Sequence, residues 1–171
     1  MEFIEVAIED TLKDAYKQLY KGAFLTTLKD GIVNTMTIGW GGVQIIWGKP
    51  VFVIYVRYTR HTYEMLEHND EFTISVPVKQ HAVKELSYCG IKSGRDGDKI
   101  QGCGLSVVRG RTMDTPIIKE CDLHYECKII YRQAMEPFAI QEREKNKYYK
   151  GHDYHVMYYG EIVDVYQTKG E

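Results

Sequence analysis

The sequence has no apolar run that approaches the ~20 residues needed for a membrane-spanning helix. It also lacks a signal-peptide pattern, because residues 1–10 are acidic and contain no basic start followed by an apolar core. Neither charge sign dominates: the net charge is −2 and the pI is near 6.3. There is therefore no electrostatic case for nucleic acid or a membrane surface as a partner. These absences predict a cytoplasmic protein that binds neither nucleic acid nor membrane.

Cysteine is scarce and irregularly spaced. The sequence has no C-x-x-C pair and no histidine pair at zinc-like spacing beside a cysteine. It also lacks a G-x-G-x-x-G sequence, the mark of a dinucleotide-binding domain. We therefore expect reduced, mostly buried thiols, no disulfide framework and no metal site. The cysteines are Cys89, Cys103, Cys121 and Cys127.

The chain has the length and composition of one domain with its own core. It has 171 residues, of which 44% are apolar and 27% are charged. No internal repeat, low-complexity segment or linker interrupts it, so we expect a single domain over residues 1–171. The compositional excess is aromatic, because 14 of the residues are tyrosines and several lie in strand-like runs.

Alternating and β-branched runs predict at least six strands, whereas helical spacing predicts only a few short helices. Many strands with tight turns indicate a mainly β fold, a closed or partly closed β-barrel capped by helices. Gly160 is expected at a bulge or a close approach, and Asp10 or Thr11 is expected to cap the first helix. A helix over 82–88 is expected to end at Cys89-Gly90, with the glycine in the left-handed conformation. Strands are predicted over 22–28, 34–38, 43–47, 51–56, 71–76, 123–131 and 153–166, helices over 8–20, 62–68 and 82–88, and turns over 29–31 and 48–50.

The stretch 34–62 holds the strongest functional signal. An apolar strand ends directly before Arg57, and Arg60 and His61 follow at the start of a predicted helix. Guanidinium groups and the N–H groups of a helix start both bind anions. We interpret this stretch as the site of a phosphate-bearing cofactor whose reactive end lies along Thr35–Thr37. The alternative is a solvated basic turn paired with Glu64 or Glu67. Strand alternation favours Arg57 over Arg60 as the one that faces inward.

Several motifs in order along residues 20–166 point to a known family. They are N-T-M-T-I-G-W-G-G, W-G-K-P, Y-V-R-Y-T-R-H-T, E-F-T-I-S-V-P, C-G-x-x-S-G-R-D-G-D-K and H-V-M-Y-Y-G-E-I. Together they resemble the flavin reductase-like family, most closely its flavoredoxin branch. The resemblance implies the FMN-binding split β-barrel fold, a homodimer, and FMN bound non-covalently near the dimer interface. It also implies electron transfer from NADH or NADPH to flavin, ferric complexes or a redox protein partner.

The resemblance further implies which residues form the site. His155 is similar to a histidine that contacts flavin or nicotinamide or helps to deliver a proton, and is the one catalytic candidate. The plainer alternatives are exposed threonines on a strand, a mobile polar loop and a structural histidine. Trp40 and Trp47 are expected to pack in the barrel or an interface. The cofactor-binding residues implied are Thr35, Met36 and Thr37 at the flavin ring, Arg57, Tyr58 and Thr62 at the phosphate, and Cys89, Gly90, Ser93, Gly94 and Lys99 in a second cofactor loop.

Three functions follow from this interpretation. The first is an FMN-dependent NAD(P)H oxidoreductase, in which hydride passes from the nicotinamide to flavin and the cofactor supplies most of the chemistry. The second is a flavoredoxin-like electron carrier that holds FMN tightly and exchanges electrons with another protein. The third is a non-catalytic FMN binder. Without a domain of its own, NAD(P)H has to bind over the FMN.

Overall fold

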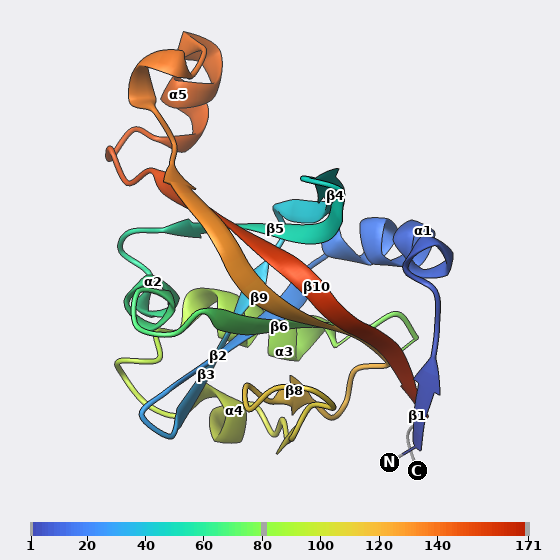
Figure 1. Ribbon diagram of the computed structural model, residues 1–171. Helices are drawn as coiled ribbons and strands as arrows, with labels where there is room; N and C mark the ends of the chain where they lie inside the picture. The colour runs from blue at the N-terminus through green and yellow to red at the C-terminus, as the bar shows by residue number, and fades with distance from the viewer. Residues whose placement is uncertain (1, 80–81, 170–171) are drawn as a thin grey trace.

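The structure, a computed structural model, describes residues 2–79 and 82–169, in which strands predominate (Figure 1). No described helix is both long and apolar enough to cross a membrane. The helices are α1 (Ile8–Leu19), α2 (His61–Leu66), α3 (Val83–Ile91), α4 (Lys99–Gly102) and α5 (Glu142–Tyr148), with a 3-10 turn η1 (Pro137–Ala139). The strands are β1 (Glu2–Glu5), β2 (Ala23–Lys29), β3 (Ile32–Ile38), β4 (Gly41–Ile46), β5 (Lys49–Arg57), β6 (Glu71–Val76), β7 (Val107–Val108), β8 (Ile117–Ile118), β9 (Leu123–Ala134) and β10 (His155–Lys169).

The main sheet is antiparallel and curls back on itself. Its strand order is β3-β2-β6-β9-β10-β5-β4, and β1 pairs with the far end of β10. The two edge strands β3 and β4 are joined by only residues 39–40, so opposite edges of the sheet must lie close together. Figure 1 shows β9 and β10 as one long twisted ribbon that carries α5 at its end, away from the other helices. The predicted mainly β, partly closed barrel is confirmed.

Aromatic and β-branched side chains on the inner face of the sheet form the main core. Phe52, Phe72, Tyr125 and Tyr158 are all at most 1% exposed. Burial of each such side chain stabilises the fold by about 1.5–3 kcal/mol relative to its exposure. Gly160 lies at a register shift between β9 and β10, as predicted. A Cβ there would lie 2.5 Å from a carbon of the Phe72 ring, so the position also requires close approach.

Two polar side chains of β9, His124 and Glu126, are buried on the other face of the sheet. A loop after β7 covers it and is tied to the Glu126 carboxylate, which accepts hydrogen bonds from backbone N–H groups of Arg111 (2.6 Å), Thr112 (2.8 Å) and Met113 (3.1 Å). The Tyr166 hydroxyl donates a further bond to Glu126 at 2.5 Å. A buried carboxylate is tolerated because these donors replace water.

Three predicted boundaries are wrong for local reasons. The residue that caps α1 is Ala7, not Asp10 or Thr11, and the Thr11 hydroxyl donates to the Ile8 carbonyl inside the first turn. Helix α3 continues through Gly90 to Ile91, so Gly90 is not a left-handed end. The turn expected at 48–50 is the two-residue turn Trp47-Gly48, where both residues have positive φ, the geometry of a tight hairpin.

Candidate functional site

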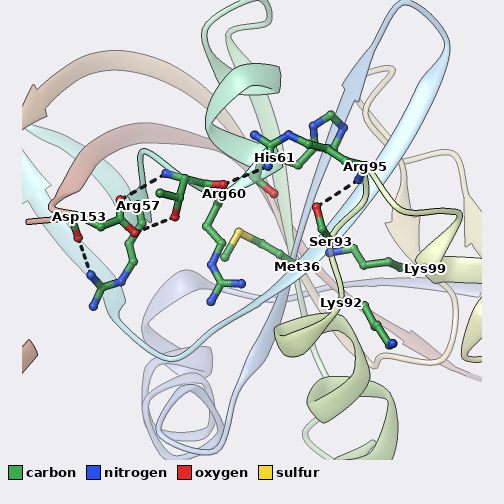
Figure 2. A pocket seen from close by; sticks show the side chains of 11 residues that line it. Met36, Arg57, Arg60, His61, Lys92, Ser93, Arg95, Lys99 and Asp153 are labelled. Carbon is green, nitrogen blue, oxygen red and sulfur yellow. Dashed lines mark hydrogen bonds between the residues drawn. The ribbon is translucent and has the colours of Figure 1, made fainter. Parts of the chain in front are cut away.

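A cleft of about 210 Å³ lies where the end of β5, the start of α2 and the loop after α3 meet (Figure 2). Five of its lining side chains are Lys or Arg, and one, Asp153, is a carboxylate. An excess of cations in a concave site favours an anionic ligand. The lining residues are Met36, Arg57, Thr59, Arg60, His61, Thr62, Lys92, Ser93, Arg95, Lys99 and Asp153.

Both arginines of the central stretch line this cleft. The Arg57 guanidinium donates to the backbone carbonyls of Asp153 and, at 3.0 Å, of Tyr148. Arg60 donates to the Gly90 carbonyl at 3.1 Å, and Figure 2 shows its side chain in the middle of the cleft. The expectation that only one of them faces inward is wrong, because Arg60 lies beyond the end of β5, where strand alternation no longer applies.

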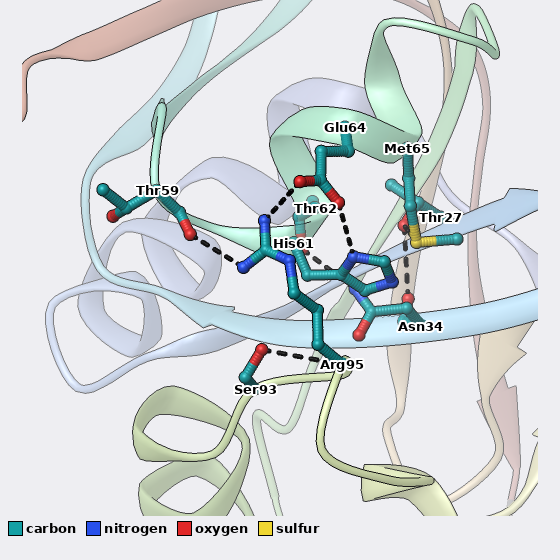
Figure 3. Close-up of polar contacts among 9 residues, drawn as sticks. All are labelled: Thr27, Asn34, Thr59, His61, Thr62, Glu64, Met65, Ser93 and Arg95. Atoms are coloured by element: carbon teal, nitrogen blue, oxygen red, sulfur yellow. Dashed lines mark hydrogen bonds and ion pairs between the residues drawn. The ribbon is translucent and has the colours of Figure 1, made fainter.

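The loop after α3 is fastened to α2 by an ion-pair network (Figure 3). Arg95 donates to Glu64 at 2.6 Å and to the Thr59 carbonyl at 3.0 Å, while His61 lies 3.1 Å from the other Glu64 oxygen. Hydrogen bonds from Arg95 and His61 hold the pKa of Glu64 below its usual value. The network brings Ser93 across the cleft from the arginines.

The network leaves most of the cleft's cations without a carboxylate partner. Among residues 2–79 and 82–169, neither arginine of the central stretch nor either lysine of the cleft forms an ion pair. The alternative interpretation was a basic turn neutralised by Glu64 or Glu67. Of the basic residues in that turn, His61 pairs with Glu64, whereas Glu67 pairs with Arg132 instead. Lys99 is 6% exposed, and burial lowers its pKa. Its ammonium donates to the Cys89 carbonyl at 3.2 Å.

A second hollow of about 210 Å³ adjoins the cleft and shares Met36, Arg57 and Arg60 with it. Its other lining residues are mostly apolar or aromatic, so it offers a flat ring a different environment from that of the cationic cleft. Strand β3 borders it as an edge strand that pairs only with β2, which leaves one row of backbone groups free of the sheet. Those other residues are Thr37, Ile38, Gly39, Trp40, Tyr55 and His155.

His155 lies in this hollow with its protonation state fixed by its surroundings. Burial and the Arg57 charge lower its pKa to about 4, so the imidazole is neutral near pH 7. The Tyr149 hydroxyl lies 2.8 Å from Nδ1, and the Trp40 ring centroid lies 4.9 Å from that of His155. A hydroxyl donates better to imidazole than to the Met135 thioether at 3.2 Å. With Nδ1 accepting, the proton of the neutral ring is on Nε2.

The structure brings seven of the predicted site residues together. Cys89 and Gly90 lie directly behind the cleft, where their carbonyls hold Lys99 and Arg60. The seven that line one or both hollows are Met36, Thr37, Arg57, Thr62, Ser93, Lys99 and His155.

Three other predicted residues lie outside both hollows. Thr35 is fully buried, its hydroxyl donates to the Leu25 carbonyl, and it lines a separate hollow behind the loop. Tyr58 packs edge-on against Tyr63 at 5.0 Å. Gly94 faces the same separate hollow as Thr35.

Sequence reasoning missed several lining residues. Arg95 lies within the quoted S-G-R-D-G-D-K run, so the motif offered a signal for it. Thr59 lies within the Y-V-R-Y-T-R-H-T run and Lys92 within the C-G-x-x-S-G-R-D-G-D-K run. Asp153 had no local signal, because tertiary packing alone brings the segment before β10 against the end of β5. No group of three metal-ligating side chains occurs in the described part of the chain.

Comparison with known proteins gives a consistent result. Residues 20–171 match the family described as "Flavin reductase like domain". The flavoredoxin of Desulfovibrio vulgaris (Miyazaki F) has a similar structure, with a TM-score of 0.67, 26% identity, and 86% of this chain and 69% of that chain covered. An FMN-binding domain of a flavin reductases-like enzyme from Shewanella baltica OS155 has a TM-score of 0.70 at 20% identity, with 97% and 77% covered.

A curated relative gives a shorter match. The uncharacterized protein YddH of Escherichia coli (strain K12) is 33% identical over 98 residues, which are 57% of this chain and 51% of that protein. The chain spans about half the length of the curated relatives it matches. The structural matches therefore cover more of this chain than the sequence matches to the curated relatives do. They show the split-barrel fold.

Proposed function

The chain belongs to the flavin reductase-like family, and we propose that it binds FMN and passes electrons between NAD(P)H and the flavin or a downstream acceptor. The observation that carries this proposal is the cationic cleft that opens into an aromatic hollow at an edge strand. FMN combines a phosphate of nearly two negative charges with a flat, mostly apolar ring, and the two hollows match these two ends.

The phosphate end is assigned to the cations that lack carboxylate partners. Arg57 and Arg60 offer guanidinium N–H groups from one wall, and Lys99 offers a buried ammonium from the other. Thr62 and Ser93 add hydroxyl groups that donate to phosphate oxygens. Charge-assisted hydrogen bonds of this kind contribute about 1.5–3 kcal/mol each, enough for tight binding when several act together.

The ring end is assigned to the hollow beside β3. Free backbone N–H and C=O groups of an edge strand suit the polar edge of a flavin, which carries donors and acceptors in alternation. Met36 lies at the junction of the two hollows, where a soft apolar side chain contacts a ring without demanding hydrogen bonds. Trp40 and Tyr55 limit the hollow on its other sides.

When bound, FMN supplies the hydride-accepting and electron-transferring chemistry. The chain's own residues bind, orient and donate hydrogen bonds. His155 presents a fixed Nε2–H donor, because Tyr149 occupies Nδ1 and the low pKa keeps the ring neutral. A neutral donor and the nearby Arg57 charge favour negative charge that develops on a ring beside them.

An electron carrier is the second candidate, because the flavoredoxin of Desulfovibrio vulgaris is among the similar structures. In that case a redox protein partner replaces NAD(P)H as donor or acceptor. We propose in either case that the chain acts as a homodimer.

The test is an absorption spectrum of the purified protein loaded with FMN, followed by anaerobic addition of NADH, then NADPH. Rapid bleaching of the flavin bands supports the oxidoreductase. Persistence of the bands until a reduced ferredoxin-type protein is added supports the carrier. A protein that neither carries nor accepts FMN contradicts the proposed function.

A further inference from the structure

Behind the cationic cleft, two thiols face each other. Cys89 lies in the last turn of α3 and Cys103 directly follows α4, and their sulfur atoms are 3.7 Å apart. A disulfide bond needs ~2.0 Å between sulfurs, a distance that small side-chain rotations supply from this starting point. The two helices are neighbours in the lower part of Figure 1.

The other two cysteines provide an internal comparison. Cys121 and Cys127 are 3% and 0% exposed, burial raises the pKa of both thiols well above the usual value, and within the described residues neither forms a thiol–thiol contact. They are small apolar core residues. Cys103, in contrast, is only partly buried, and its thiol donates to the Lys99 carbonyl at 2.9 Å.

The surroundings of the pair differ from those of an inert core thiol. Lys99 is the residue at which α4 begins, its ammonium donates to the Cys89 carbonyl at 3.2 Å, and its positive charge opposes the rise in the pKa of Cys89. A nearby lysine ammonium is a typical feature of oxidisable cysteines. Burial and the neighbouring Cys103 nevertheless raise the pKa of Cys89 to about 12. Because Cys89 is 1% exposed and Cys103 is the less buried of the two residues, we assign initial oxidation to Cys103 and the resolving role to Cys89.

We propose that Cys89 and Cys103 form a reversible redox-active thiol pair that hydrogen peroxide converts to an intrachain disulfide. In the first step the Cys103 thiol reacts with peroxide to give a sulfenic acid and one water. In the second step, the Cys89 sulfur attacks the sulfenic sulfur of Cys103 and a sulfur–sulfur bond forms. The sulfur–oxygen bond breaks, and the hydroxyl leaves with the Cys89 thiol hydrogen as a second water. The two electrons lost by sulfur reduce the peroxide, and an external thiol reverses the reaction.

The position of the pair links it physically to the cleft. The Cys89 carbonyl accepts from Lys99, and the next carbonyl, that of Gly90, accepts from Arg60. A bond between Cys89 and Cys103 joins α3, which supplies both carbonyls, to the end of α4, the helix that begins at Lys99. The proposal does not depend on flavin binding.

The test treats the purified, pre-reduced full chain with a small excess of hydrogen peroxide under native conditions, then alkylates and maps its thiols. We expect free thiols to fall from four to two, a linked peptide that contains Cys89 and Cys103, and full recovery with dithiothreitol. In the Cys103→Ser variant, Cys89 should stay reduced, and Cys121 and Cys127 should stay reduced in both proteins. Four remaining thiols, a link to Cys121 or Cys127, or a disulfide between chains overturns the proposal. Since no readout involves flavin, failure here is distinct from failure to bind FMN.

Discussion

Arg60 owes its position to its place just outside a strand. It caps α2, reaches across the cleft to one backbone carbonyl and has no carboxylate partner in the described part of the chain, so its charge remains available to a ligand. Arg57, the last residue of β5, is held by two carbonyls and lies over the Tyr149 ring at 5.1 Å. The more freely held arginine is therefore expected to respond most strongly to a phosphate.

We predict that Arg60→Gln weakens FMN binding by about 10–100-fold, because one charge-assisted hydrogen bond contributes about 1.5–3 kcal/mol. Fluorescence titration of FMN measures the effect. The matched control is Arg109→Gln, since Arg109 is exposed and pairs only with Asp114 at a distance from the cleft. Equal FMN affinity in the wild type and Arg60→Gln would exclude Arg60 from the phosphate site.

The burial of His124 makes the stability of the fold depend on pH. It is fully buried between Ser75, Thr168 and the Cys121 carbonyl, and burial lowers its pKa to about 4. Because an unfolded histidine titrates near 6.5, the unfolded chain binds the proton first as pH falls. The contribution of His124 to stability is therefore full above pH 6.5 and is lost between pH 6.5 and 4.

We predict that, between pH 7 and 4.5, the free energy of unfolding in urea falls by about 2 kcal/mol more for the wild type than for His124→Gln. The exposed His68, changed to Gln, should leave the wild-type pH dependence intact. Parallel pH dependences of the wild type and His124→Gln would show that this histidine is not held neutral by the fold.

At the residue scale, motif positions were predictable and side-chain directions only in part. The cations of the R-Y-T-R run and Lys99 follow from residue type and the family motifs. The outward packing of Tyr58 and the burial of Thr35 depend on which neighbour each side chain meets, and no local pattern reports that. Asp153 reaches the cleft only through the pairing of β10 with β5.

At the scale of elements, β10 organises the sheet. It pairs with β5, β9 and β1, and its register with β9 shifts at Gly160. A glycine is required there because the Phe72 ring fills the space that any side chain at position 160 would need. Strands were predictable because period-two patterns persist over several residues, whereas helix ends depend on single residues and were missed in α1 and α3.

We predict that Gly160→Ala destabilises the chain by about 1–3 kcal/mol in urea unfolding, because an added methyl group overpacks the core against Phe72 and the Cβ of Cys127. Gly151→Ala is the matched control, since its Cβ meets nothing within 4 Å. If both variants unfold at the same urea concentration, the close approach at Gly160 does not exist in solution.

At the scale of the whole molecule, large apolar side chains are exposed together on the β4–β5 hairpin, and contiguous exposed apolar side chains mark interaction surfaces. Ile45 is 81% exposed and Trp47 is 66% exposed on the β4–β5 hairpin. The Trp47 ring packs against the Tyr131 ring of β9, with ring centroids 6.0 Å apart. Tyr131 in turn packs against Tyr159 of β10, with ring centroids 5.1 Å apart. We propose that this surface is the homodimer interface.

We predict that analytical ultracentrifugation finds twice the 19.9 kDa chain mass, and that Ile45→Glu shifts the equilibrium toward monomer. Ile32→Glu, on the β2–β3 hairpin and 65% exposed, should leave the dimer intact. A wild-type protein that sediments as a monomer at all concentrations would contradict the dimer.

If the cationic cleft holds the phosphate of FMN, that phosphate contributes much of the binding free energy. Calorimetric titration of the wild type with FMN and with riboflavin, which has the same ring and no phosphate, measures this contribution. We expect FMN to bind at least tenfold more tightly, because several unpaired cations meet the phosphate. Equal affinities for FMN and riboflavin, or no binding of either, would contradict the account.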